Sequence, residues 1–396
     1  MESVIKQKID LIAEYIYAKV QEQQAEESFG LYTSSFGYLL FLFYYSRHSK
    51  NEEYVSLTED YAERLLNQFA TELKLHTFCG GLAGVLYLLD FLRENRFIDM
   101  DVSDVQQTLD NYLIFKMQQD IQQQRYDFMH GALGVGLYFL KKGNHQEQIQ
   151  ELVDFLYNTA EKDISSKVFK WKSIINVEEN IVGYNIALSH GISSIIIFLS
   201  RVIKSGIDNE KINEMLSGAV NYVLSQQINF QQYGSYFPSQ SLENKNLPIS
   251  KSRLAWCYGD LGIAIALWQA GKTTNNMEWK EKGLEVLLQS TQRLSVVESL
   301  VQDAGICHGS AGIALIYHRM YIETQRDEFR KATDYWLNQT INFSQFSDGL
   351  VGYKTYRLDG WICDYSLLTG IAGIGLVLLS CMTHDNQIWD EMLLLS

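Results

Sequence analysis

The chain has 396 residues, 46% of them hydrophobic and 20% charged, so it can bury one large core or two smaller ones. Its formal net charge of −14 at pH 7 argues against a nucleic acid as the main partner, because no basic stripe is available for phosphate contacts. Five cysteines are an odd and sparse set, which indicates metal ligands or core residues in a reducing cytoplasm and not a disulfide framework.

The N-terminal segment M-E-S-V-I-K-Q-K-I-D-L-I-A-E-Y-I-Y carries charges throughout, so it predicts an amphipathic helix and not a signal peptide. The longest apolar runs, such as G-I-A-G-I-G-L-V-L-L-S-C near residue 370, are shorter than the roughly 18 residues that a membrane helix needs. We therefore expect a cytoplasmic protein.

A frame of two variable residues followed by G-x-x-G recurs about every fifty residues. Its copies are C-G-G-L-A-G at 79–84, M-H-G-A-L-G at 129–134, C-Y-G-D-L-G at 257–262, C-H-G-S-A-G at 307–312 and L-T-G-I-A-G at 368–373, with degenerate copies at 189–194 and around 33–37. Each copy leads into an apolar stretch, and amphipathic segments lie between these stretches. The pattern predicts seven repeats, each with one outer and one inner helix.

Small residues at the start of each inner helix would let helices crowd around a central axis. Seven such pairs can close into a ring, which protects both ends without capping repeats. We therefore expect an all-α protein, an (α/α)7 toroid that forms a single domain over residues 1–396.

Two stretches depart from the helical pattern. Residues at about 165–187 read as strand, and residues 229–252 hold the only two prolines, Pro238 and Pro248, which break helices. The sequence predicts that these insertions form a small β-containing extension.

The frame also places metal-binding residue types at equivalent positions. Cys257 and Cys307 occupy the first frame position of adjacent repeats, and His308 follows directly. A Cys-Cys-His set suits Zn²⁺ and leaves a fourth tetrahedral position open. The alternative is that both cysteines are small core residues, because a spacing of fifty residues is not in itself a zinc signature.

The other cysteines are expected to be structural. Cys79 shares the frame but lies in the second repeat, and Cys363 and Cys381 lie outside the frame, where we expect core residues.

Further polar residues belong to the same end of the inner helices. Asp127 precedes the third frame, His190 and His130 occupy second frame positions, and Arg253 precedes the fifth frame. Each also has an ordinary structural interpretation, such as a helix cap for the aspartate. We expect His190, Asp127 and Arg253 to be catalytic, and we rank His130 below them as a residue that lines the site.

Three motifs resemble those of the lanthionine synthetase C-like (LanC) cyclases of lantibiotic biosynthesis. They are S-H-G at 189–191, W-C-Y-G at 256–259 and C-H-G at 307–309, together with the pair Tyr126-Asp127 and with Arg253. The resemblance covers essentially the whole chain, and the family fold is an α/α toroid with a small β-containing extension. One departure is His130, since some members of the family carry an acidic residue there.

The resemblance implies one zinc ion per chain, held by Cys257, Cys307 and His308. It implies catalytic importance for His190, Asp127 and Arg253, and Trp256 and Tyr258 of the W-C-Y-G motif are expected to line the site. The implied reaction closes thioether rings in a dehydrated precursor peptide with leader and core regions. A dehydratase and an ABC transporter at the inner face of the cell membrane are the implied partners.

The expected mechanism follows from the acidity of the thiol. A free thiol is mostly protonated at neutral pH, and zinc would deprotonate it. Attack on a dehydroalanine or dehydrobutyrine then generates an enolate that needs a proton. We assign His190 as the acid, Asp127 as the residue that orients it or receives the thiol proton, and Arg253 as a partner of Asp127 or of the oxyanion.

Three other interpretations remain open. The first is a LanC-like protein that holds zinc and glutathione without cyclising a peptide. A second interpretation is a protein prenyltransferase, whose zinc would take a carboxylate ligand such as Asp260 or Asp303 in place of a cysteine. The third is a toroidal glycosidase with paired carboxylates such as Asp127 and Asp364.

Overall fold

The computed structural model describes residues 2–22, 29–69, 75–99, 103–163, 165–176, 179–244, 248–383 and 388–396. They form two compact units. Unit 1 comprises Met1–Leu113 and Leu294–Leu393, and unit 2 comprises Ile114–Arg293 and Leu394–Ser396. The predicted single domain over 1–396 stays a prediction.

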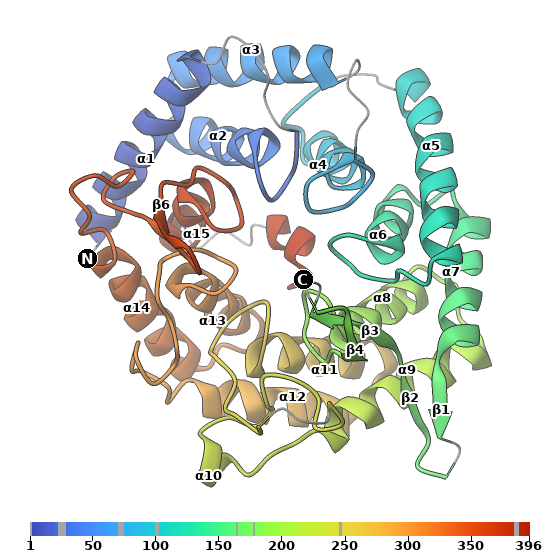
Figure 1. The fold of residues 1–396 in the computed structure, drawn as a ribbon. Coiled ribbons are helices and arrows are strands. Elements are labelled where there is room, and N and C mark those ends of the chain that lie inside the picture. The colour runs from blue at the N-terminus through green and yellow to red at the C-terminus, as the bar shows by residue number, and fades with distance from the viewer. Residues whose placement is uncertain are drawn as a thin grey trace. The chain divides into compact units, whose positions relative to one another are not determined.

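Helices dominate both units (Figure 1). They are α1 (Glu2–Glu22), α2 (Ser35–Ser49), α3 (Glu52–Phe69), α4 (Leu82–Glu94), α5 (Ser103–Gln122), α6 (Ala132–Lys142), α7 (Gln146–Thr159), α8 (Ile192–Lys204), α9 (Glu210–Ser225), α10 (Phe230–Tyr233), α11 (Asp260–Thr274), α12 (Met277–Ser290), α13 (Ser310–Thr324), α14 (Asp327–Asn342), α15 (Ile371–Thr383) and the 3-10 helix η1 (Ile388–Leu393). The predicted N-terminal helix is α1.

Seven inner helices begin at the repeated frame, as predicted. They are α2, α4, α6, α8, α11, α13 and α15, and the first two or three turns of each are buried almost continuously. The outer helices are amphipathic and pack against the inner helix of the same repeat, as in the pairs α2–α3, α8–α9, α11–α12 and α13–α14. The expected all-α class is confirmed.

Inner helices are neighbours in chain order within each unit. In unit 1, α13 packs against α15, α15 against α2, and α2 against α4, while α1 packs against α15, so that helices from the first and last repeats are in contact (Figure 1). In unit 2, α6 packs against α8, and α8 against α11. Equivalent positions of successive repeats are therefore brought side by side inside each unit.

The predicted β-containing extension lies in unit 2. Strands β1 (Glu161–Asp163) and β2 (Val168–Lys170) form one antiparallel pair, and β3 (Lys172–Asn176) and β4 (Ile181–Tyr184) form another. The second insertion, 229–252, is mostly irregular, with the short helix α10 and a bridge between Pro238 and Lys251. Residues 164, 177–178 and 245–247 of these insertions lie outside the described residues.

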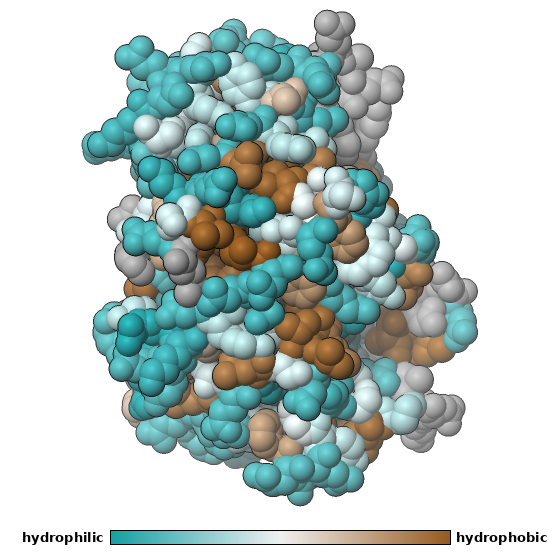
Figure 2. All heavy atoms as spheres, turned by 90° about the vertical axis from the view of Figure 1, so that its left-hand side faces the viewer, coloured by the Kyte–Doolittle hydropathy of each residue, from teal (hydrophilic) through white to brown (hydrophobic). Residues whose placement is uncertain are grey.

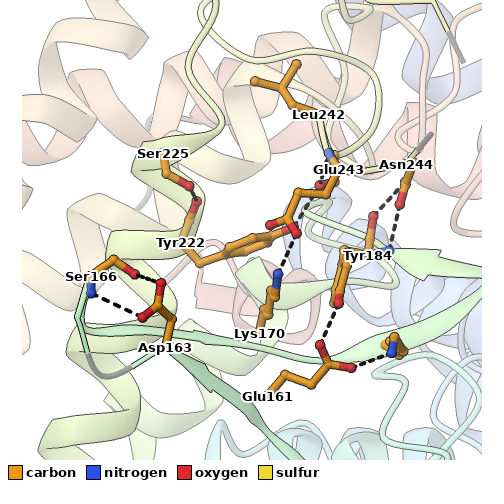
Figure 3. Close-up of polar contacts among 12 residues, drawn as sticks. Glu161, Asp163, Ser166, Lys170, Tyr184, Tyr222, Ser225, Leu242, Glu243 and Asn244 are labelled. Carbon is orange, nitrogen blue, oxygen red and sulfur yellow. Dashed lines mark hydrogen bonds and ion pairs between the residues drawn. The ribbon is translucent and has the colours of Figure 1, made fainter. Parts of the chain in front are cut away.

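The two insertions are joined by a polar network (Figure 3). The Asn244 side chain accepts a hydrogen bond from Tyr184 N at 2.9 Å and donates one to Tyr184 O at 3.0 Å, so it replaces a missing strand neighbour. The Tyr184 hydroxyl donates to Glu161 at 2.6 Å, and Lys170 pairs with Glu243. The extension is therefore one packed element, as the sequence indicated.

A third hairpin was not predicted. Strands β5 (Thr355–Arg357) and β6 (Gly360–Ile362) form an antiparallel pair in unit 1, and Gly360 has the positive φ of +131° that only glycine adopts easily at this tight turn. The stretch is too short and too polar at its tip to show a two-residue alternation in the sequence.

The face of the molecule drawn in Figure 2 is mainly hydrophilic. In Figure 2, hydrophobic side chains form several separate patches among hydrophilic ones on the face that carries α1 and α14. Across the described part of the chain, no helix combines the length and the apolar character that a membrane crossing requires.

Candidate metal centre and acid–base pair

The turns that precede the inner helices are linked to one another by backbone hydrogen bonds at the first frame position. In unit 1, Cys307 N donates to Leu368 O at 2.9 Å, Leu368 N to Tyr32 O at 3.0 Å, and Tyr32 N to Cys79 O at 2.9 Å. In unit 2, Ser189 N donates to Cys257 O at 3.3 Å. Successive turns thus lie against each other with their frame positions aligned.

The glycines of the frame make this turn possible. A Cβ on Gly309 would lie 2.3 Å from Gly305 N, and a Cβ on Gly312 would lie 1.8 Å from Ile306 O. The chain therefore folds back on its own backbone just before the helix begins, and a side chain at either position would force it apart. This close approach is the physical reason for the G-x-x-G pattern.

One group of metal-ligating side chains converges among the described residues. The ligand atoms of Cys257, Cys307 and His308 all lie within 4.8 Å of one another. Cys257 is buried, Cys307 and His308 are half-buried, and none of the cysteines of the chain forms a disulfide. Two thiolates and one imidazole fit the ligand preferences of Zn²⁺.

The remaining cysteines differ in their surroundings. Cys79 and Cys381 are buried, as expected of structural residues, and burial raises the pKa of the Cys381 thiol. Cys363 is exposed and contacts Asp348 O, so the expectation that it belongs to the core was wrong. It directly follows strand β6, whose middle residue is exposed.

Asp127 and His190 form a pair in unit 2. Oδ2 of Asp127 lies 2.7 Å from Nδ1 of His190, while Oδ1 of Asp127 accepts a hydrogen bond from His130 N at 2.8 Å. The aspartate thus closes its own turn, as a capping residue does, and also orients a histidine on the next turn. Nε2 of His190 lies on the far side of the ring from the carboxylate, and 31% of the side chain is exposed.

The two histidines of this group have pKa values shifted in opposite directions. Burial lowers the pKa of His190, but the hydrogen bond and charge of Asp127 and the charge of Cys257 outweigh it, so the pKa is raised above the ordinary value. Loss of solvation lowers the pKa of His130; Asp127 opposes that shift and the charge of His190 adds to it. The environment therefore favours a protonated His190 beside a neutral His130.

His130 and Tyr258 flank His190. The rings of His130 and His190 stack with centroids 5.6 Å apart and planes tilted by 18°, and the Tyr258 ring centroid lies 6.4 Å from that of His190. Asn185 Nδ2 donates to the Tyr258 hydroxyl at 3.2 Å, which fixes that side chain. Both side chains therefore lie beside the His190 ring, and their role in lining a site stays a prediction.

Arg253 and Trp256 differ from this group. Arg253 is half-buried, and the structure, over the residues it describes, gives it no ion pair with Asp127. Trp256 is fully buried, so it supports the turn from inside the core and does not reach an open surface. The expectation of an Arg253–Asp127 pair has no counterpart in this geometry.

The carboxylates considered for other enzyme classes have structural partners. Asp260 is fully buried, accepts hydrogen bonds from Tyr236 N and Phe237 N, and faces Arg293 at 3.5 Å. Asp364 accepts hydrogen bonds from Ser366 N and the Thr369 hydroxyl. Neither belongs to the convergent group of metal-ligating side chains found in the described residues.

An aspartate or asparagine five positions before the second frame position has a further structural role that the sequence-based predictions above do not include. Asn185, Asp303 and Asp364 occupy this place in three repeats, and each accepts a hydrogen bond from the backbone N–H two residues later. Aligning the repeats on their frames shows the recurrence, so the signal was present in the sequence.

Comparisons with known proteins give a family match and a shared fold. The family model described as lanthionine synthetase C-like protein matches residues 25–394. The nisin biosynthesis protein NisC of Lactococcus lactis subsp. lactis is 21% identical over 334 residues, which is 78% of this chain and 78% of that protein. A solved structure of nisin cyclase shares the fold, with a TM-score of 0.78, 19% identity, and coverage of 99% of this chain and 97% of that chain.

Proposed function

The chain belongs to the lanthionine synthetase C-like family, and we propose that it is a zinc-dependent lanthionine cyclase. Its substrate is a dehydrated lantibiotic precursor peptide with leader and core regions. A cysteine S–H bond of the peptide and the Cα=Cβ π bond of dehydroalanine or dehydrobutyrine break, a C–S bond forms at the β-carbon, and a C–H bond forms at the α-carbon. The product is a thioether ring with the same mass as the linear peptide.

The observation that carries the proposal is the convergence of Cys257, Cys307 and His308. In the proposed enzyme these three side chains hold one Zn²⁺, and their donor set fits the ion because it has two thiolates and one neutral imidazole. When bound, zinc would supply an open coordination position at which a thiol loses its proton. The residues of the chain must then position the peptide and deliver the proton to carbon.

His190 is the proposed proton donor to the α-carbon. Asp127 holds its Nδ1 at 2.7 Å and keeps the ring protonated to higher pH, so Nε2 carries the proton on the side away from the carboxylate. The stacked His130 and the fixed Tyr258 define the orientation of that ring. Arg253 is assigned to the developing oxyanion, because its guanidinium is not taken up by Asp127.

The cellular setting is also a proposal. We assign the protein to the cytoplasm, with a peripheral place at the inner face of the cell membrane through a dehydratase and an ABC transporter. Membership of the lanthionine synthetase C-like family is the observation behind this assignment.

The test is ring closure of a dehydrated precursor peptide by purified protein. Because cyclisation leaves the mass unchanged, the free thiols are counted by alkylation and mass spectrometry, against the uncatalysed rate at the same pH. Cys257→Ala is expected to lose zinc and activity together, and His190→Ala to keep zinc but lose stereocontrolled closure.

Two outcomes would contradict the proposal. A His190→Ala variant that closes rings at the wild-type rate would refute the role of that histidine. Wild-type protein that contains zinc and retains glutathione, but never turns over the peptide, would favour a binding protein in place of the cyclase.

A further inference from the structure

Asp303 faces the third residue of the metal-ligating group. Its Oδ2 lies 3.4 Å from Nε2 of His308, and its side chain is only 2% exposed. Oδ1 accepts a hydrogen bond from Gly305 N at 3.1 Å, and Oδ2 also accepts one from Tyr356 N at 3.0 Å, in strand β5. Two backbone donors thus hold the carboxylate in one orientation, with one oxygen directed at the imidazole.

The same turn in other repeats shows that this orientation is built into the fold. In Asp364 one oxygen also closes the turn, at 2.7 Å from Ser366 N, and the other accepts a hydrogen bond from the second-frame side chain, Thr369, at 2.6 Å. Asp303 repeats the arrangement, with His308 at the place of Thr369. The second oxygen at this position therefore faces the second frame position in the repeats that lead into α13 and α15.

We propose that Asp303 is a positioning residue for the metal centre, an inference that rests on the proposed zinc site. Asp303 accepts the Nε2–H of His308 and so fixes the neutral tautomer in which Nδ1 has the free lone pair that binds the ion. The convergent group in the described chain consists of Cys257, Cys307 and His308 and does not include Asp303. In the proposed arrangement Nε2 meets the carboxylate, which leaves Nδ1 for the ion. Carboxylates that orient metal-binding histidines in this way commonly change metal affinity about 10–100-fold when they are removed.

The experiment measures zinc affinity by competition with a chromophoric chelator and records the visible spectrum of the Co²⁺-substituted protein. Asp303→Asn is expected to weaken zinc binding about 10–100-fold and to alter the Co²⁺ bands. Asp364→Asn is the matched control, because it disrupts the same turn one repeat later, where no metal-ligating side chain follows. It is expected to bind zinc with the wild-type affinity.

Two further variants keep the test decisive. Asp303→Ser retains an oxygen that can accept from Gly305 N and loses the one that faces His308, so it separates the turn from the orientation of the ring. In a double-mutant cycle, Asp303→Ser should have no further effect on zinc affinity once His308→Ala is present, because the aspartate acts through the histidine.

Two results would overturn the proposal. One is a zinc affinity unchanged in both Asp303 variants, and the other is an Asp303→Ser substitution that reduces zinc affinity as much in His308→Ala as in the wild type. Wild-type protein that binds no zinc would instead refute the proposed function, so the two failures are distinguishable.

Discussion

Gly312→Ala provides a direct test of why the frame needs its glycines. A Cβ at this position would lie 1.8 Å from Ile306 O, and such atoms essentially never approach closer than 3.0 Å, so the turn would have to move by at least 1.2 Å. Alanine favours a helix by about 1 kcal/mol relative to glycine. The clash acts in the opposite direction, and the geometry of the turn decides which effect is larger.

The cost exceeds the gain. Overpacking of a rigid site costs about 1–3 kcal/mol. Displacement of the turn also weakens the hydrogen bonds from Ile306 N and Cys307 N to Leu368 O, which are 3.0 and 2.9 Å long and contribute about 1 kcal/mol each. Gly312→Ala is therefore expected to lower the free energy of unfolding by about 2–4 kcal/mol. Because Cys307 and His308 lie in the displaced turn, zinc affinity should fall as well.

Urea unfolding of the zinc-free protein, followed by circular dichroism, measures the stability, and a chelator competition measures the zinc affinity. Gly143→Ala is the control: its φ of +79° is unfavourable for alanine by about 1 kcal/mol, but nothing lies within 4 Å of the new Cβ. It should lose stability without losing zinc. A Gly312→Ala variant with the wild-type urea midpoint and wild-type zinc affinity would refute this reasoning.

Three further predictions concern other contacts. Asp127→Asn should lower the pKa of His190, which NMR of zinc-free protein with labelled histidine measures. The stabilisation that the wild-type contact gives is fully present below the ordinary histidine pKa and is lost as the pH rises through the raised pKa of His190. A His190 titration unchanged in the variant would contradict this prediction. Arg319→Met removes the guanidinium whose Nε lies 2.7 Å from the buried Asp390 carboxylate in the wild type. It should cost about 3–5 kcal/mol in urea unfolding, most of it recovered when Asp390→Leu is added. Asn244→Ala should speed proteolysis of the β-containing extension while zinc binding stays intact, and equal cleavage rates would argue against its role as the missing strand neighbour.

Much of the site was readable from the sequence because the protein is built of repeats. Once seven frames are aligned, Cys257 and Cys307 stand at the first frame position of successive repeats, and His308 directly follows Cys307. Inside each unit, packing of successive inner helices brings equivalent frame positions side by side. The same logic placed His190 and Asp127 on neighbouring turns. Neither step required knowledge of distances, since the period of the pattern determines which residues become neighbours.

Other features depend on contacts that no periodic pattern encodes. The hairpin β5–β6 is too short to alternate visibly, yet its Tyr356 N–H helps to hold the Asp303 carboxylate against His308. The direction of an arginine side chain likewise follows from its local surroundings, and Arg253 does not pair with Asp127 in the described chain.

The amino-acid pattern alone determined the repeat number, the inner and outer helices, and the residue types that converge, because periodic burial of apolar side chains and close packing at glycine impose those outcomes on the chain. Tertiary structure decided which oxygen of an aspartate faces which ring nitrogen. Such orientations depend on hydrogen bonds between segments distant in sequence, which are formed only when the repeats have packed.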